Sequence, residues 1–354
     1  MTRDFPTARI DIDLTALAAN YRTLQALQPS AEVAPVVKAD AYGLGVGRVA
    51  PHLMRHGAKT FFVARRDEGV MLRRILGSEA VIYVLDGLPT DRRDDPMVFI
   101  ERDLRPVLNT REQMQRWIDG PPIAAALHVD TGMNRLGIRP EDIADLPVGR
   151  TPDMLISHLA CGDEPEHPLN AVQLALFREA ATRFAGIRLS LANSAGSFLG
   201  PDYGFDVTRP GISLYGGGPF GAPHRDIKPV ASLSARVLQV RPLKAGETVG
   251  YGATFTAAQD MTIATFGLGY ADGLLRSFAG KGFAVVNDEL RPLVGRVSMD
   301  AFSMDVSGLD VAVDDWVEVF GAQQPIDDVA QASGTIAYEW LTRIGARVER
   351  HYAG

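Results

Sequence analysis

Apolar residues alternate along the chain between short β-rich runs and stretches with apolar residues three and four positions apart. The β-rich runs before residue 216 cover residues 33–38, 60–64, 80–85, 105–108, 123–130, 154–159, 188–193 and 206–215. Helices are expected at 15–27, 45–56, 65–76, 110–118 and 170–184, with Thr110 and Asn170 as the N-caps of the last two. Eight strands alternating with helices are what a (β/α)₈ barrel requires, although a doubly wound open sheet shows the same alternation.

After about residue 228 the pattern changes to crowded strand-like runs joined by short turns that hold Gly, Asp and Asn. These runs cover residues 231–243, 248–255, 261–269, 282–288, 291–300, 301–306 and 315–320, and a helical excursion is expected near 325–344. The pattern predicts a mostly antiparallel β domain. Because residues 216–229 are rich in Gly and Pro, we expect the boundary there, with domains 1–228 and 229–354. A further strand at 8–14 is expected to join one of the two sheets.

The length of the chain agrees with two domains, and its composition disfavours some classes of partner and metal site. A chain of 354 residues exceeds the size at which a single core stops growing, so two domains are expected. The net charge of -7 disfavours nucleic acid or an anionic membrane surface as a partner. No apolar run approaches the roughly 18 residues of a membrane span, and the start has no signal-peptide pattern. The single cysteine, Cys161, fits a reducing cytoplasm and argues against a multi-cysteine metal site.

Polar side chains end several of the predicted barrel strands, where barrel enzymes place their chemistry. These residues are Lys38, Asp130, His158, Asn193, Ser194 and Arg209. A lysine at the mouth of an apolar strand is partly desolvated, so Lys38 is a candidate Schiff-base former; the alternative is a lysine that simply reaches solvent. The glycine-containing segments 193–196 and 209–218 offer backbone amides that could bind a phosphate.

The chain resembles the bacterial alanine racemases, which are pyridoxal 5'-phosphate (PLP) enzymes of fold type III. The matching motifs are VVKADAYGLG (36–45), DTGMNRLG (130–137), SHLACGDE (157–164), NSAGSF (193–198), TRPGISLYG (208–216), VGYGATFTA (249–257), GLGYADG (267–273), GRVSMD (295–300) and TIAYEWL (335–341). They follow the family's order over nearly the whole chain. The resemblance implies a PLP-binding barrel, a β domain and a homodimer in which each active site combines one subunit's barrel with the other's β domain.

The resemblance also implies roles for single residues. Lys38 would hold PLP covalently, Arg209 would face its pyridine nitrogen, and His158 would support Arg209. The phosphate would be bound by Tyr42, Ser194, Gly211, Ile212 and Tyr338, with Asn193 beside them. Racemisation needs proton exchange on both faces of the α-carbon, which two bases can provide: Lys38 and the partner's Tyr251. Arg135 and Met299 would bind the substrate, and Asp163, Tyr270 and Arg296 would line an access corridor. No metal is expected.

Four positions depart from the family pattern. Many members carry a carbamylated lysine where this chain has His128, which cannot become an anionic carbamate, so Arg135 needs another anchor. Asp40 and Leu44 replace a common asparagine and histidine, and Ser298 stands where cysteine is frequent. None of these changes touches the expected acid–base pair.

The favoured hypothesis is therefore an isomerase that interconverts L-alanine and D-alanine, for peptidoglycan precursors or for alanine catabolism. One alternative is a racemase of broader specificity that acts on serine, or a related decarboxylase. A second is a non-catalytic PLP-binding carrier, which would have no use for Tyr251 in a second domain. A third is a PLP-free Schiff-base aldolase, which would leave Arg209 without a purpose.

Overall fold

The computed structural model describes residues 5–89, 91 and 96–354. The chain divides into two compact units. The first, called here the barrel unit, is Ala18–Leu214, and the second, the C-terminal unit, combines residues 5–17 with Tyr215–Gly354. The units part just before the segment 216–229 in which we expect the boundary; the division between residues 228 and 229 stays a prediction.

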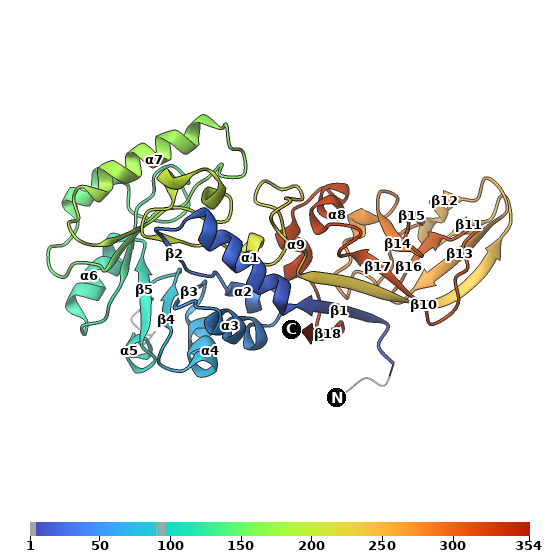
Figure 1. Ribbon diagram of the computed structural model, residues 1–354, viewed down its shortest axis with the longest axis horizontal. Helices are drawn as coiled ribbons and strands as arrows, with labels where there is room; N and C mark the ends of the chain where they lie inside the picture. Colours follow the sequence, from blue (N-terminus) through green and yellow to red (C-terminus); the bar gives the residue numbers. More distant parts are fainter. Residues whose placement is uncertain (1–4, 90, 92–95) are drawn as a thin grey trace. The chain divides into compact units, whose positions relative to one another are not determined.

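The barrel unit is built on a ring of short parallel strands, of which Figure 1 labels β2 to β5. In its described residues the ring contains eight strands: β2 (Glu32–Val33), β3 (Thr60–Val63), β4 (Val81–Val84), β5 (Leu104–Leu108), β6 (Ala126–His128), β7 (Met154–Ile156), β8 (Arg188–Ser190) and β9 (Val207–Thr208). Strands β3 to β8 pair in sequence order, and β2 pairs with β9. A bridge from Val36 to Phe62 joins the β2 run to β3, and Arg209 N donates to Ala192 O (2.8 Å) between β8 and β9. The predicted barrel is confirmed.

The strands are nearly continuous apolar runs because parallel strands are buried on both faces. The sequences TFFV in β3 and VIYV in β4 are almost completely buried. Helices lie outside the strands, as Figure 1 shows for α3 to α6 around β3 to β5. The helices that begin before Leu214 are α1 (Leu14–Leu27), α2 (Lys38–Tyr42), α3 (Val46–Arg55), α4 (Arg66–Leu76), α5 (Met97–Glu101), α6 (Arg111–Asp119) and α7 (Pro168–Ala181).

One of the two predicted helix caps is confirmed and the other is wrong. The Thr110 hydroxyl accepts from Gln113 N (3.2 Å) at the start of α6, as expected. Helix α7 starts two residues earlier than predicted, and its cap is His167, whose Nδ1 accepts from Leu169 N (3.2 Å). The reason is Pro168, which lacks an amide hydrogen and is therefore suited to the first helical position. Asn170 lies inside the first turn and donates to Glu164 O.

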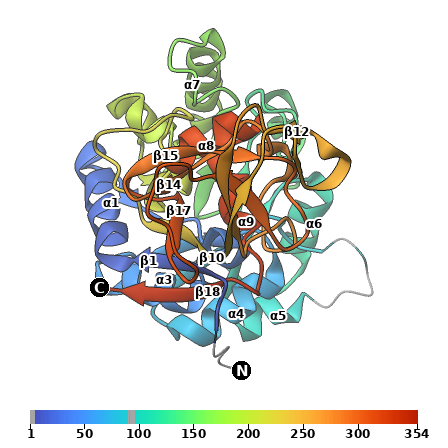
Figure 2. The ribbon, with the colours of Figure 1, turned by 90° about the vertical axis from the view of Figure 1, so that its right-hand side faces the viewer.

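The C-terminal unit is a mostly antiparallel sheet, as predicted. Figure 2, turned by 90° from Figure 1, shows this unit facing the viewer. Its strands are β1 (Ala8–Asp13), β10 (Ala231–Leu243), β11 (Thr248–Val249), β12 (Phe255–Thr256), β13 (Met261–Phe266), β14 (Phe283–Val286), β15 (Glu289–Val294), β16 (Phe302–Asp305), β17 (Trp316–Phe320) and β18 (Glu349–Ala353), and its helices are α8 (Ile326–Ser333) and α9 (Ala337–Thr342). The main sheet runs β13-β16-β15-β14-β17-β10-β1-β18, and β13 also pairs with β10. The strand at the start of the chain therefore joins the C-terminal sheet.

One predicted strand is broken. The run 248–255 is not continuous, because a 3₁₀ turn at Tyr251–Ala253 separates β11 from β12. Gly250 and Gly252 have φ of 72° and 73°, a left-handed backbone that glycine adopts without a steric penalty. The turn takes Tyr251 out of the ladder, and its side chain is 72% exposed.

Candidate functional site

The residues predicted at the strand ends lie past the carboxyl ends of the barrel strands. Lys38 follows the β2 run, His158 follows β7, Ser194 follows β8 and Arg209 comes directly after β9. Because the strands are parallel, these positions share one end of the barrel, which is where barrel enzymes place their chemistry.

Lys38 stands at the start of a left-handed turn, not at the end of a long strand. Ala39, Asp40, Ala41 and Tyr42 have φ between 52° and 56°, and Gly43 continues the turn at 82°. Each non-glycine residue in this region costs about 1–2 kcal/mol, so four in succession store considerable strain. Strain of this size persists only where the surroundings hold it, and it is concentrated at functional sites.

Burial lowers the pKa of the Lys38 amine, and the positive charge of Arg135 lowers it further. Glu68 and Asp86 act in the opposite direction through their negative charges, but burial is the larger effect. The structure thus agrees with the sequence-based argument for a partly desolvated lysine. An amine of this kind is a better nucleophile and base near neutral pH than an exposed lysine.

The same left-handed turn carries Tyr42 to the loop after Arg209. A Cβ atom on Gly211 would lie 2.1 Å from the Tyr42 hydroxyl oxygen, so only glycine fits there. The Ser194 hydroxyl accepts from Gly211 N (2.9 Å) and Ser213 N (3.2 Å). The Ser213 hydroxyl is buried and has no partner within the described part of the chain. Hydroxyls and backbone amides therefore converge here, a donor set suited to a phosphate.

Asn193 organises the segment that presents Ser194. Its side-chain oxygen accepts from Gly196 N (2.9 Å), and its carbonyl accepts from Ser197 N (3.1 Å). These bonds form a 3₁₀ turn at Gly196–Phe198, shortly after Asn193 and Ser194. Asn193 thus acts on the loop, and Ser194 is the residue that contacts the neighbouring amides.

Arg209 is a buried cation held by neutral oxygens. Its guanidinium donates to Ser190 O (2.9 Å), Ser190 Oγ (2.5 Å) and Ser157 O (2.5 Å), and it lies 5.8 Å from the centre of the Phe62 ring. Burial lowers its pKa to about 10, so it stays protonated at neutral pH. A guanidinium has five donors, so donors remain for a ligand.

His158 is uncharged at neutral pH. Burial holds its pKa well below the usual range, and the positive charges of Arg209 and Arg135 act in the same direction. The backbone oxygen of His158 accepts from Gln173 Nε2 (2.9 Å), which fixes the segment after β7. His158 therefore supplies no positive charge to the site at neutral pH.

His128, which stands at the family's carbamylated-lysine position, is held by Asn109. The Asn109 amide nitrogen donates to Leu85 O (2.8 Å) and Val107 O (2.9 Å), so its oxygen faces His128 Nδ1 at 2.8 Å. Nδ1 is consequently the donor, and Nε2 carries the lone pair. Burial, then the charge of Arg209, lowers the pKa of His128 to about 4.

The loop that carries Arg135 is built on the backbone of His128. Ile138 N donates to His128 O (2.8 Å), and the Asp130 carboxylate accepts from the amides of Gly132, Met133 and Asn134. A Cβ on Gly137 would lie 3.2 Å from the His128 ring, so the ring packs directly against this loop. Asp130 is therefore a turn-forming residue.

The low pKa of His128 predicts a pH-dependent stability. Between the ordinary value of 6.5 and about 4, the unfolded chain binds a proton that the folded chain does not, so stability falls as the pH drops through this window. His128→Gln should remove about 2 kcal/mol of the loss between pH 7 and pH 5, measured by urea unfolding at both values. His56→Gln, at an exposed position, is the control. An unchanged pH dependence in His128→Gln would show that His128 does not titrate in this way.

Four residues predicted in the second domain come together. Tyr251, Tyr270, Arg296 and Met299 line one open depression of the C-terminal unit, of ≈ 1160 Å³, together with Arg276 and Arg343. Tyr251 and Met299 are 72% and 52% exposed, and they lie together in this depression. Tyr338 lies on α9 of the same unit and Asp163 lies exposed in the barrel unit.

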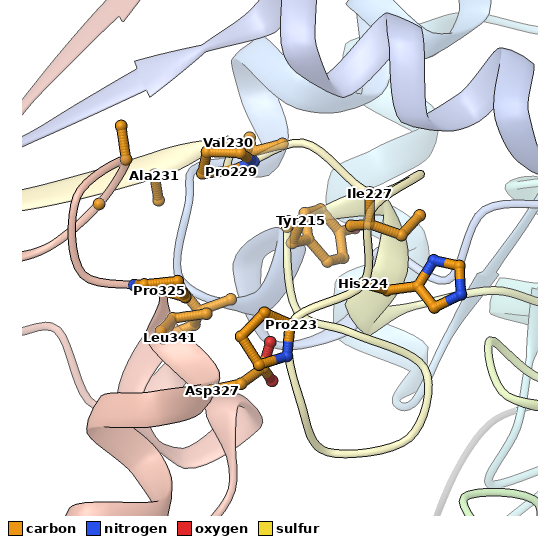
Figure 3. Close-up of a pocket in the computed structure, with 14 residues that line it drawn as sticks. Tyr215, Pro223, His224, Ile227, Pro229, Val230, Ala231, Pro325, Asp327 and Leu341 are labelled. Carbon is orange, nitrogen blue, oxygen red and sulfur yellow. The ribbon is translucent and has the colours of Figure 1, made fainter.

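A second cavity of the C-terminal unit contains none of the predicted site residues. It encloses ≈ 500 Å³ and is lined by Tyr215, His224, Ile227, Pro325 and Asp327, among others (Figure 3). The buried Asp327 carboxylate accepts from Gly218 N (2.8 Å), and burial raises its pKa. This bond ties α8 to the segment after the barrel, which is a structural role.

Two general properties of the described residues bear on the site. Among them, no group of three or more His, Cys, Asp or Glu side chains is placed to hold a metal ion. No helix in the same part of the chain has the length and apolar character needed to cross a membrane.

Three residues that support the site were not predicted from the sequence. Glu68, Asn109 and Ser190 contact the segments of Lys38, His128 and Arg209, respectively. Only Glu68 has a recognisable sequence signal, because an acidic residue three positions after a helix start is typical of a capping box. The others depend on pairing between strands that are distant in sequence.

Comparisons with known proteins agree with the motifs. The family model described as "Alanine racemase, N-terminal domain" matches residues 12–219, and "Alanine racemase, C-terminal domain" matches residues 230–352. The alanine racemase of Rhodospirillum rubrum is 43% identical over 99% of this chain and 97% of that protein. A catabolic alanine racemase from Agrobacterium fabrum is 42% identical over 98% of this chain and 92% of its own length.

Solved structures show the same fold. A crystal structure of alanine racemase from Bartonella henselae with covalently bound pyridoxal phosphate has a TM-score of 0.91 and 36% identity, and covers 99% of this chain and all of that one. A biosynthetic alanine racemase from Pseudomonas aeruginosa has a TM-score of 0.90 and 35% identity with the same coverage.

Proposed function

Because this chain belongs to the alanine racemase family, we propose that it is an isomerase that interconverts L-alanine and D-alanine with PLP as its cofactor. The observation that carries the proposal is the turn after Lys38. This turn presents a lysine of lowered pKa and, four residues later, places the Tyr42 hydroxyl on Gly211 in a group of phosphate-type donors. A reactive amine and a phosphate cradle on one short turn are what a covalently held phosphorylated aldehyde requires.

The residues of the barrel unit fit PLP. The hydroxyls of Tyr42 and Ser194 and the amides of the loop at Gly211 and Ile212 would bind its phosphate. Arg209 would donate to the pyridine nitrogen with the donors that Ser190 and Ser157 leave. When bound, PLP withdraws electrons from the substrate's α-carbon and so makes its hydrogen acidic.

Arg209 also limits what the site can do. An arginine stays protonated and has no acceptor, so it can donate to the ring nitrogen but cannot accept a hydrogen bond from a protonated ring nitrogen and therefore does not stabilise that form. With a pKa of about 10, Arg209 keeps this property near neutral pH. We infer that it restrains electron withdrawal into the ring and thereby discourages side reactions such as transamination.

Proton transfer in this proposal uses two residues on opposite faces. The Lys38 amine, with its lowered pKa, would remove or return the α-proton on one face. The partner's Tyr251 would do the same on the other face. A phenol has an ordinary pKa of about 10, so Tyr251 needs a neighbouring cation to favour its phenolate. Since His158 is neutral, we assign this charge to Arg135 or Arg209 and not to His158.

Arg135 and the partner's Met299 would hold the substrate, and Asp163 with the partner's Tyr270 and Arg296 would line the corridor to it. Tyr338 would complete the phosphate contacts. Arg135 is exposed on a loop whose ends are fixed by His128, so it is accessible to a small carboxylate. The bulk of Tyr270 and Tyr338 favours a substrate with a small side chain, such as alanine.

The proposed assembly is a homodimer with shared active sites. The exposed Tyr251 and Met299 in a depression rimmed by arginines support this, because large apolar side chains rarely stay in solvent without a function. The relatives include both a catabolic and a biosynthetic enzyme, so we propose either D-alanine supply for peptidoglycan or alanine breakdown, in the cytoplasm. Light scattering should give a molar mass twice that of the 38.3 kDa chain.

The activity is tested by incubation with each alanine enantiomer in deuterium oxide. The purified protein should be yellow, and borohydride should fix the cofactor on Lys38. Either enantiomer should give both, with deuterium at the α-carbon. A protein that binds PLP but forms no second enantiomer would contradict the proposal, as would activity on serine with none on alanine.

A further inference from the structure

Glu68 links the segment of Lys38 to a different part of the barrel. Its carboxylate accepts from Ala64 N (2.8 Å) and Arg65 N (3.0 Å) at the start of α4, which is ordinary helix capping. The other oxygen accepts from Ala39 N at 2.7 Å, and Ala39 is 29 residues away and directly follows Lys38. The third bond is not required by the helix, so it indicates a second role for the carboxylate.

The bond from Ala39 holds the first residue of the strained turn. The turn is closed internally by Ala41 N to Val37 O (3.0 Å) and Gly43 N to Ala39 O (2.8 Å). At its other side the Asp40 carboxylate accepts from Val46 N (2.7 Å), the first residue of α3. Two carboxylates therefore fix a left-handed backbone that is unfavourable by itself. The direction of the Lys38 side chain depends on this backbone.

We propose that Glu68 is a positioning residue for Lys38, whose carboxylate holds the left-handed turn and provides a negative charge that faces the amine. The inference rests on the proposed use of Lys38 and deepens it. Glu68 touches neither substrate nor cofactor in this account. It acts through the backbone of Ala39 and through its charge.

The charge of Glu68 gives the proposal a property that can be measured. Burial and Arg135 lower the pKa of Lys38, whereas Glu68 and Asp86 raise it. The charge of Lys38 also acts on His158, which is neutral, and Arg65 lowers the pKa of Asp86. Removal of the Glu68 charge should therefore lower the pKa of Lys38 further. A carboxylate that served only as a mechanical clamp would not move it in this direction.

The test is the pH dependence of Lys38 acylation in the full-length, PLP-free protein. Limited acetic anhydride is the probe, and mass spectrometry of the Lys38 peptide is the readout, with the exposed Lys281 as internal reference. In Glu68→Gln the midpoint should fall by about half a unit, which is roughly a threefold faster reaction below the midpoint. Asp67→Asn is the matched control, because Asp67 is 89% exposed on the same helix and should leave the midpoint unchanged.

A second variant separates the effect of the carboxylate's charge from that of its hydrogen bond to Ala39. Glu68→Asp keeps the charge but is one methylene shorter, so it should lose the bond to Ala39. Its Lys38 midpoint should stay near that of the unaltered protein, while kcat for alanine falls about tenfold with little change in KM. A midpoint that does not fall in Glu68→Gln would overturn the proposal. If that variant does not fold, unchanged kcat in Glu68→Asp would overturn it. Acylation needs neither PLP nor alanine, so its result is independent of whether the chain is a racemase.

Discussion

Lys38→Ala should lose the yellow chromophore and lower kcat for alanine by about 10⁴-fold or more. In this account the amine has two tasks, because it attaches the cofactor and it exchanges the α-proton on one face. Its lowered pKa, set first by burial and then by Arg135, serves both. The measurements are the absorbance spectrum after addition of PLP and the racemisation rate in both directions.

Lys59→Ala is the control for this variant, since Lys59 is exposed just before β3 and should not affect either measurement. The thermal midpoint of Lys38→Ala should remain close to that of the unaltered protein, because the left-handed turn is held by backbone bonds of Ala39, Ala41 and Gly43. A Lys38→Ala protein that still forms a borohydride-reducible adduct and racemises at a comparable rate would contradict the assignment.

Tyr251→Phe should lower racemisation by about 10²–10⁴-fold in both directions while the chromophore is retained. The phenol hydroxyl is removed, but the exposed turn between β11 and β12 and its glycines are unchanged. With Lys38 as the only remaining base, one enantiomer should still exchange its α-hydrogen for deuterium with retention of configuration. The other enantiomer should exchange very slowly.

This difference between the enantiomers distinguishes a lost base from a damaged site, which would slow both exchanges equally. Tyr203→Phe, at a half-buried tyrosine of the barrel unit, is the matched control and should racemise normally. Equal exchange of both enantiomers in Tyr251→Phe would mean that Lys38 serves both faces and that the phenol has another role.

The barrel could be predicted because parallel strands are nearly continuous apolar runs that alternate with helices. Each of the eight predicted runs overlaps a strand, and all the observed strands but β5 are shorter than predicted; the run 33–38, for example, becomes β2 at Glu32–Val33 and a left-handed turn. Sequence alone could not reveal that turn, because Ala39 and Ala41 favour right-handed helix, and one of the bonds that hold the turn comes from Glu68, which is 29 residues away from Ala39.

The chemically distinctive residues of the candidate site could be predicted from the sequence, but the residues that support them could not. Residues with distinctive chemistry, such as Lys38 and Arg209, follow strands and could be recognised from that position and from the family motifs. The residues that support them, Asn109 and Ser190, are ordinary polar types whose partners are 19 residues away in sequence in both cases. The separate depression around Tyr251 could not be inferred from spacing, because the strand prediction for 248–255 hid the turn that exposes it.

The most direct test of the shared active site is complementation between two inactive variants. Lys38→Ala and Tyr251→Phe subunits, co-expressed with different tags and isolated as heterodimers, should regain about half of the specific activity of the unaltered protein. In each heterodimer one site would combine an intact Lys38 with the partner's intact Tyr251, and the other site would lack both. Heterodimers no more active than the two parent variants would contradict the account, because Lys38 and Tyr251 would then not meet across subunits.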